Sequence, residues 1–246
     1  MIEPPPPSQS SKDISLKKLT RDIYEKRMKE HVKEKSQSQQ FMKTPDYKHM
    51  NAVDLMLNRH SVRLHNIDDE LLAKALSNDV YSKTFEENSR KQIISDEVYK
   101  KAFRCCIQAP SACNKQPCHF FLTRDVDYIM KEYHKKHNYL HCNPSEIIIC
   151  CVDSNAIYES SEHNDMSKYQ FLDLGLAIEN LLLALTYENI STCIYNAMWN
   201  MKGLEKIKER YNIPKNMIIG CFIYCGKMNK YIQFLPSKRE QELHFR

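Results

Sequence analysis

The chain has 246 residues, a formal net charge of +5, 42% hydrophobic residues and 27% charged residues, as is typical of a soluble globular protein. Its length fits one large domain, or one domain with an appendage, and needs no disulfide or metal to stabilise a core. No apolar run approaches the roughly 18 residues of a membrane helix, and the Pro- and Ser-rich start has no apolar core of a secretory signal. These features exclude membrane-spanning and secreted classes and predict a cytoplasmic protein.

The positive charge is concentrated near the N-terminus. Residues 1–52 hold 11 Lys and Arg against 7 Asp and Glu, whereas the rest of the chain holds 25 against 24. A nucleic-acid-binding body would need a basic face, which this nearly neutral remainder does not favour. We therefore predict no nucleic-acid partner.

Glycine and cysteine exclude further classes of site. The chain has only 4 glycines, and they are not clustered as a dinucleotide fingerprint or a P-loop requires. Its 10 cysteines form no CxxC pair, and several lie in apolar runs, so we interpret them as reduced, buried thiols and predict no metal site.

Hydrophobic periodicity gives the predicted elements in chain order. Helices are predicted over residues 14–35, 51–58, 68–76, 95–108, 127–137, 168–188 and 202–211, and strands over 119–122, 146–152, 192–195 and 217–225. The strand over 146–152 is apolar on both faces and is expected at the centre of a sheet. The helix over 168–188 is apolar around much of its circumference and is expected to be deeply buried. Intermixed strands and helices indicate an α+β or α/β fold.

One main domain with an N-terminal appendage is expected. Residues 1–50 form an N-terminal tail and helical arm, and residues 51–246 form the main domain. The tail over 1–12 is rich in proline and serine and is expected to be disordered. Ser95 is expected to cap the helix that follows it.

Three segments could bind a ligand. Arg59-His60-Ser61-Val62-Arg63 suits a phosphate, because guanidinium groups and a hydroxyl donate to phosphate oxygens, although these residue types fit a solvated basic turn better. Residues 109–117 gather Pro, Ser, Asn and Gln between a helix and a strand. Their amides suit the edge of a flat heterocycle, but turn chemistry explains the same residues equally well. Lys238 and Arg239 could close over a phosphate or form an exposed basic tail.

Together these segments resemble the nitroreductase family of FMN enzymes over about residues 51–240. The family's Arg-Arg-Ser-x-Arg motif is similar to residues 59–63, and its Ala-Pro-Ser-Ser-x-Asn-x-Gln-Pro-Trp turn to residues 109–118. Its central-helix pattern, Asp-x-Gly-x-Ala-x-x-Asn-x-x-Leu-x-Ala, matches residues 173–184. An Ile-Pro pair at 213–214, a strand with glycines at 220 and 226, and a basic C-terminal pair follow in the family's order.

The resemblance implies an α+β, nitroreductase-like three-layer fold, with a central mixed, mainly antiparallel sheet flanked by helices. It also implies a homodimer through the long central helix, with FMN at each subunit interface. The implied cofactor-binding residues are Arg59, His60, Ser61, Arg63, Asn114, Gln116, Lys238 and Arg239, with Pro110, Ser111 and Ala112 reaching FMN from the other subunit. By analogy, the phosphate and ribityl chain are held by Arg59, Ser61, Lys238 and Arg239. Arg63 lies near the flavin N1/O2 edge, and Asn114 bonds the isoalloxazine or ribityl.

The implied activity is hydride transfer from NAD(P)H through bound FMN to a nitroaromatic, a quinone or a related electrophile. Such chemistry belongs to the cofactor, so no catalytic side chain is expected. Several departures keep alternatives open: a long stretch between Arg63 and Ser95, Cys118 in place of the family's Trp, and an atypical turn over 189–199. One alternative is a specialised activity of the superfamily, such as dehalogenation, flavin fragmentation or azoline oxidation. The other is a non-catalytic FMN-binding protein.

Overall fold

The computed structural model describes residues 40–62, 65, 93–133, 144–156, 167–196, 201–229 and 231–234. The helices predicted over 14–35 and 68–76 lie outside these residues, as do Arg63, Lys238 and Arg239. In chain order the described elements are β1 (Gln40–Lys43), η1 (Tyr47–His49), α2 (Ala52–Asn58), α5 (Asp96–Cys106), η2 (Ala112–Asn114), β2 (Cys118–Thr123), α6 (Val126–Tyr133), β3 (Glu146–Asp153), α7 (Ser167–Tyr187), β4 (Ile190–Asn196), α8 (Met201–Arg210), β5 (Met217–Lys227) and β6 (Tyr231–Phe234).

The main sheet has the strand order β2-β3-β5-β4, and each neighbouring pair is antiparallel. The strand predicted to be central is central, because β3 lies between β2 and β5 and is buried from Glu146 through Val152. Ser61 adds a parallel bridge to Thr192 of β4. The mainly antiparallel sheet with a parallel addition is therefore confirmed. β1 and β6, which the sequence did not predict as strands, pair in a separate two-stranded sheet.

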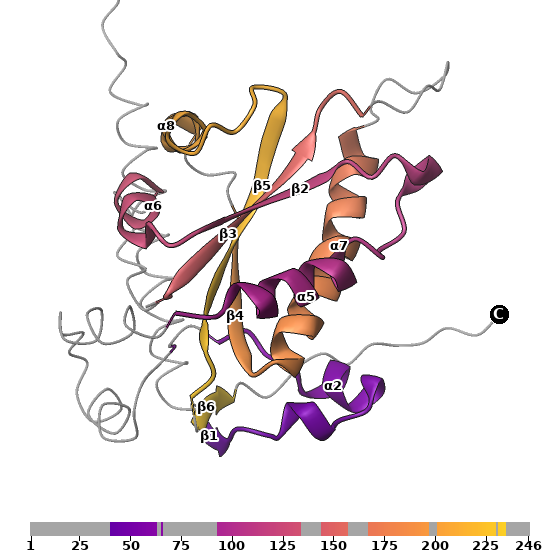
Figure 1. The fold of residues 1–246 in the computed structure, drawn as a ribbon, viewed down its shortest axis with the longest axis vertical. Helices are drawn as coiled ribbons and strands as arrows, with labels where there is room; N and C mark the ends of the chain where they lie inside the picture. The colour runs from indigo at the N-terminus through magenta and orange to yellow at the C-terminus, as the bar shows by residue number, and fades with distance from the viewer. Residues whose placement is uncertain are drawn as a thin grey trace, which may run out of the picture. The chain divides into compact units, whose positions relative to one another are not determined.

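Two helical layers cover the two faces of this sheet (Figure 1). Alternate residues of β3 point to opposite faces, so Ile148 and Cys150 pack with α5 and α7, whereas Ile147 and Ile149 pack with α6 and α8. This arrangement lies within one compact unit, Lys43–Ile232; the rest of the chain, Met1–Met42 and Gln233–Arg246, makes the other. The domain boundary predicted at residues 50 and 51 stays a prediction.

Helix α7 is buried on one side and exposed on the other in the single chain. Leu174, Leu181 and Leu185 pack into the core, but Leu172 is 59% exposed and Leu176 is 41% exposed. The expectation of a deeply buried helix therefore holds for one face. None of the described helices combines the length and the apolar character needed to cross a membrane.

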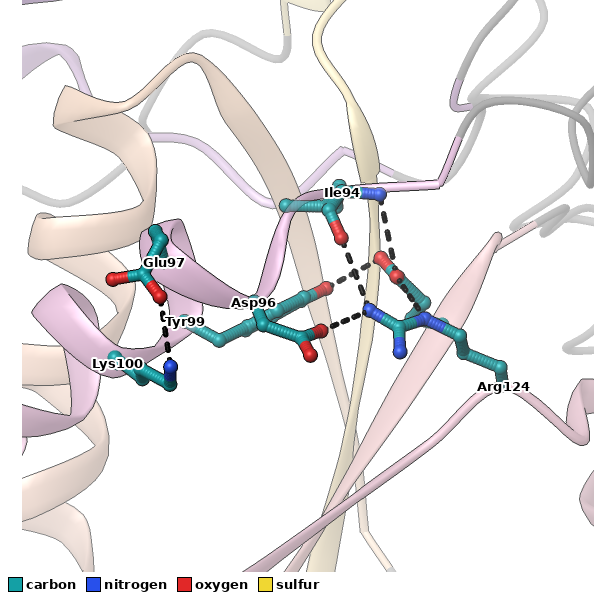
Figure 2. A network of polar contacts seen from close by, with 7 residues as sticks. Ile94, Asp96, Glu97, Tyr99, Lys100 and Arg124 are labelled. Atoms are coloured by element: carbon teal, nitrogen blue, oxygen red, sulfur yellow. Dashed lines mark hydrogen bonds and ion pairs between the residues drawn. The ribbon is translucent and has the colours of Figure 1, made fainter.

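The start of α5 is fastened by a buried carboxylate (Figure 2). Glu146 of β3 is fully buried and accepts hydrogen bonds from Tyr99 Oη at 2.7 Å, Arg124 Nε at 3.0 Å and the Ile94 amide at 3.3 Å. Arg124 also donates to Asp96 Oδ1 at 2.6 Å. Ser95 takes the predicted N-cap position, but its hydroxyl caps no amide among the described residues. The start of α5 is therefore held by the Glu146 and Arg124 hydrogen bonds and not by the predicted cap from the Ser95 hydroxyl.

Candidate functional site

The segment after α2 runs along the edge of the main sheet. Asn51 caps α2 by accepting a hydrogen bond from the Asp54 amide at 2.9 Å, and the backbone becomes extended at Arg59. Ser61 then bridges Thr192 of β4, and the Val62 amide donates to the Thr192 carbonyl at 2.8 Å. Residues 61 and 62 of the first predicted motif are thus held against β4.

The side chains of Arg59 and His60 in this segment each lie near a charged group. Arg59 is 23% exposed, and its Nε lies 3.3 Å from Oε1 of Glu179 on α7. Burial, and secondarily the charge of Arg59, lowers the pKa of His60 from its ordinary value. His60 is therefore neutral at pH 7, and Arg59 supplies the positive charge of this stretch.

His65 fastens the end of the same segment. It is fully buried, and its Nδ1 lies 2.6 Å from Ser191 Oγ. The single hydrogen of the Ser191 hydroxyl has the carbonyls of Gly226 and Lys227 within reach, at 3.0 Å and 3.2 Å. The His65 tautomer with its proton on Nδ1 can therefore donate to the Ser191 oxygen while the hydroxyl donates to a carbonyl. Burial lowers the pKa of His65 to about 3, which keeps the ring neutral. Sequence reasoning missed this contact, since an isolated histidine carries no periodic signal.

The second predicted motif, residues 109–117, is a strained turn between α5 and β2. Cys113, Asn114 and Gln116 have positive φ angles of 50°, 54° and 48°. Left-handed backbone is tolerable for Asn but costs of order 1 kcal/mol or more at other non-glycine residues. Such a conformation persists only where the surroundings fix it.

Five hydrogen bonds fix this turn. The Ala112 amide donates to both carboxylate oxygens of Asp173 on α7, at 3.1 Å and 3.2 Å. The Gln116 amide donates to Ser111 Oγ at 3.0 Å, and the Gln116 side chain donates to Asn114 Oδ1 at 2.9 Å. At the far end, the Asp153 amide of β3 donates to the Pro117 carbonyl at 2.8 Å. The side chains of Asn114 and Gln116 remain exposed, so the turn presents two amides on a preorganised backbone.

Both motifs are attached to α7, but at separate places. Asp173 holds the turn and Glu179 holds Arg59. Six residues of helix separate Asp173 from Glu179 by about 9 Å along the axis and about 120° around it. In Figure 1 the segment between α5 and β2 runs beside the upper part of α7, whereas α2 lies near its lower end. Within one chain, the structure thus gathers Ser111, Ala112, Asn114 and Gln116 in one group and Arg59, His60 and Ser61 in another.

Thiol and metal chemistry receive little support in the part of the chain described. Burial raises the pKa of Cys106 to about 12 and of Cys118 to about 11, so these thiols are protonated at neutral pH. None of the nine cysteines among the described residues forms a disulfide. No group of His, Cys, Asp or Glu there is arranged to hold a metal ion.

Comparison with known proteins finds similarity to one family. Residues 128–227 match the family model described as "Nitroreductase family". A protein of Archaeoglobus fulgidus that bears the provisional name NADH dehydrogenase/NAD(P)H nitroreductase is 28% identical over 138 residues, which cover 54% of this chain and 74% of that protein.

Solved structures show the same fold. A crystal structure from Bacteroides thetaiotaomicron, with the same provisional name, superimposes with a TM-score of 0.57 at 20% identity and covers 80% of this chain and 98% of that one. An FMN-dependent nitroreductase from Clostridium difficile superimposes with a TM-score of 0.54 at 15% identity, covering 78% and 98%. The fold predicted from the sequence is therefore confirmed.

Proposed function

With the resemblance to the nitroreductase family confirmed and its fold in place, we propose that this chain is an FMN-dependent oxidoreductase. It transfers hydride from NAD(P)H through bound flavin to a nitroaromatic, a quinone or a related electrophile. The observation that carries this proposal is the turn over residues 111–116, whose left-handed backbone is fixed to α7 and β3 while the amides of Asn114 and Gln116 stay exposed.

The donor set of the described residues suits FMN. Arg59 and Ser61 supply a guanidinium and a hydroxyl for the phosphate and ribityl chain, and the amides of Asn114 and Gln116 can pair with the C=O and N–H edge of the isoalloxazine. His60 is neutral and can donate or accept without adding charge. Pro110, Ser111 and Ala112 complete the turn, and Arg63, Lys238 and Arg239 are proposed contacts from outside the described residues.

When bound, FMN supplies the hydride chemistry, and the protein supplies orientation and electrostatics. The rigid turn holds its amides at fixed positions before any ligand arrives, which reduces the entropy lost on binding. A guanidinium group such as that of Arg59 can bind phosphate oxygens in bidentate fashion. A reducing, cytoplasmic setting suits the free thiols.

We further propose a homodimer through α7. The outward face of this helix carries Leu172 and Leu176, and α2 adds Val53 and Leu57, which are 64% and 73% exposed. Exposed apolar surface of this extent is typical of interaction sites. A two-fold pairing of α7 helices would bring the Arg59 group of one subunit toward the Asn114 turn of its partner, which joins the two halves of the site.

A visible spectrum tests the function. The purified full chain, loaded with FMN and freed of excess, should show a flavin spectrum that NADH or NADPH bleaches without oxygen and that a quinone or nitroaromatic restores. Arg59→Ala and Asn114→Ala should each weaken FMN binding. A chain that takes up no FMN contradicts the proposal, whereas bound FMN that neither nicotinamide reduces indicates the non-catalytic alternative. Turnover of one narrow substrate class, with no quinone or nitro activity, indicates a specialised activity.

A further inference from the structure

A buried carboxylate stands behind the proposed flavin-binding turn. Asp173 of α7 is only 3% exposed, yet both of its carboxylate oxygens accept from the Ala112 amide, at 3.1 Å and 3.2 Å. Burying a carboxylate is unfavourable unless hydrogen bonds compensate for its lost hydration. A charge-assisted bond to a backbone amide is stronger than a neutral one, so this contact can determine the path of the turn.

The hydrogen bond from Ala112 to Asp173 lies directly before the left-handed part of the turn. Ala112 immediately precedes Cys113 and Asn114, whose φ angles of 50° and 54° lie in the left-handed region. The charge of Asp173 also reaches the other end of the turn, where it adds to burial in raising the pKa of Cys118. Asp173 therefore faces both ends of the segment that presents Asn114 and Gln116.

We propose that Asp173 is a positioning residue for the flavin site, which acts by holding the Ala112 amide against α7. This hydrogen bond keeps the turn in its left-handed conformation and directs the Asn114 and Gln116 amides outward. Asp173 does not touch the ligand in this scheme, and the inference rests on the proposed function. Loss of the carboxylate should weaken FMN binding while leaving the rest of the fold in place.

The first test replaces the carboxylate in the full chain. Asp173→Ala removes the acceptor, whereas Asp173→Asn keeps one oxygen that can accept from Ala112. FMN dissociation constants from fluorescence quenching should rise about tenfold or more for Asp173→Ala and much less for Asp173→Asn, in line with the strength of hydrogen bonds to charged groups. In the flavin-free proteins, amide exchange at residues 112–116 should be faster for Asp173→Ala than for the wild type.

A second variant removes the same bond from the other partner. Ala112→Pro deletes the amide donor, and Ser111, with φ −132° and ψ 148°, already has the extended backbone that a residue before proline prefers. Ala112 also stands at the first position of η2, where proline is well tolerated. Ala112→Pro should weaken FMN binding about as much as Asp173→Ala, and it decides the question if Asp173→Ala does not fold.

Two matched controls separate positioning from general stability. Thr186→Val removes a buried hydrogen bond to the Leu182 carbonyl on the same helix, and Glu146→Gln alters a buried carboxylate far along the chain from the turn. Both should lower the melting temperature and leave the FMN dissociation constant unchanged. Controls that weaken FMN binding as much as Asp173→Ala would overturn the positioning role.

The possible outcomes distinguish a failure of the Asp173 role from a failure of the proposed FMN-dependent function. If the wild type takes up no FMN, the proposed function fails and the role of Asp173 fails with it. If the wild type binds FMN, and Asp173→Ala and Ala112→Pro bind it equally well, only the inference about Asp173 is overturned.

Discussion

Replacing Leu172 with glutamate tests the proposed dimer and the shared site together. Leu172 lies on the outward face of α7 and is 59% exposed in the single chain. Glutamate has nearly the helix propensity of leucine, and an exposed substitution changes stability by about 0.5 kcal/mol or less. The folded monomer should therefore tolerate Leu172→Glu.

The substitution should instead weaken the association of the two subunits. Fully burying a leucine contributes about 1.5–3 kcal/mol, so the exposed part of Leu172 can still contribute about 1–2 kcal/mol in each subunit. Two-fold symmetry counts this contribution twice, and burying the new carboxylate adds a further penalty. We expect the dimer to weaken by at least about 3 kcal/mol, which corresponds to more than about 100-fold in its dissociation constant.

Sedimentation velocity over a range of concentrations measures the dimer, and flavin fluorescence measures FMN binding in the same samples. Leu172→Glu should be monomeric where the wild type is dimeric, and it should lose FMN affinity in parallel. Ile93→Glu, at a residue that is 60% exposed outside α7, is the matched control and should change neither quantity. A Leu172→Glu protein that remains dimeric, or a monomer that binds FMN normally, would refute the reasoning.

Two further predictions concern stability. Gly175→Ala should raise the free energy of unfolding of the monomer by about 0.5–1 kcal/mol, because an added Cβ meets nothing within 4 Å. Gly220→Ala should lower it by about 1–3 kcal/mol, because its Cβ would lie 2.7 Å from Leu174 Cδ2. Urea unfolding, measured in the monomeric Leu172→Glu background, checks both signs. The pKa of His65 falls from about 6.5 in the unfolded chain to about 3 in the folded chain. As the pH falls below 6.5, the unfolded chain therefore binds the proton first, and the free energy of unfolding drops by about 2 kcal/mol between pH 8 and pH 5. His65→Gln should flatten this part of the pH profile, and an unchanged slope would contradict the assignment.

Sequence patterns predicted the elements whose burial is periodic and local. The strand around Ile147 to Val152 was placed at the centre of the sheet because both of its faces are apolar, and β3 lies there. The contacts that shape the site join residues distant in sequence and leave no such pattern. His65 meets Ser191 across 126 positions, and Asp173 meets Ala112 across 61. The partner of a buried polar residue therefore cannot be predicted from local sequence spacing and is identified only in the folded structure.

Helix α7 also explains why composition alone could not describe the site. Its apolar residues predicted a buried helix, but Leu172 and Leu176 remain exposed in the single chain, as expected of a helix that a second subunit covers. Asp173 and Glu179 lie about 9 Å apart along this helix and about 120° apart around it, so the described residues of one chain hold the two groups at separate places. In the proposed dimer, FMN would bind two subunits at once and must favour their association. By linkage, dimerisation must then tighten FMN binding by the same factor, so the dimer dissociation constant should fall as FMN is added.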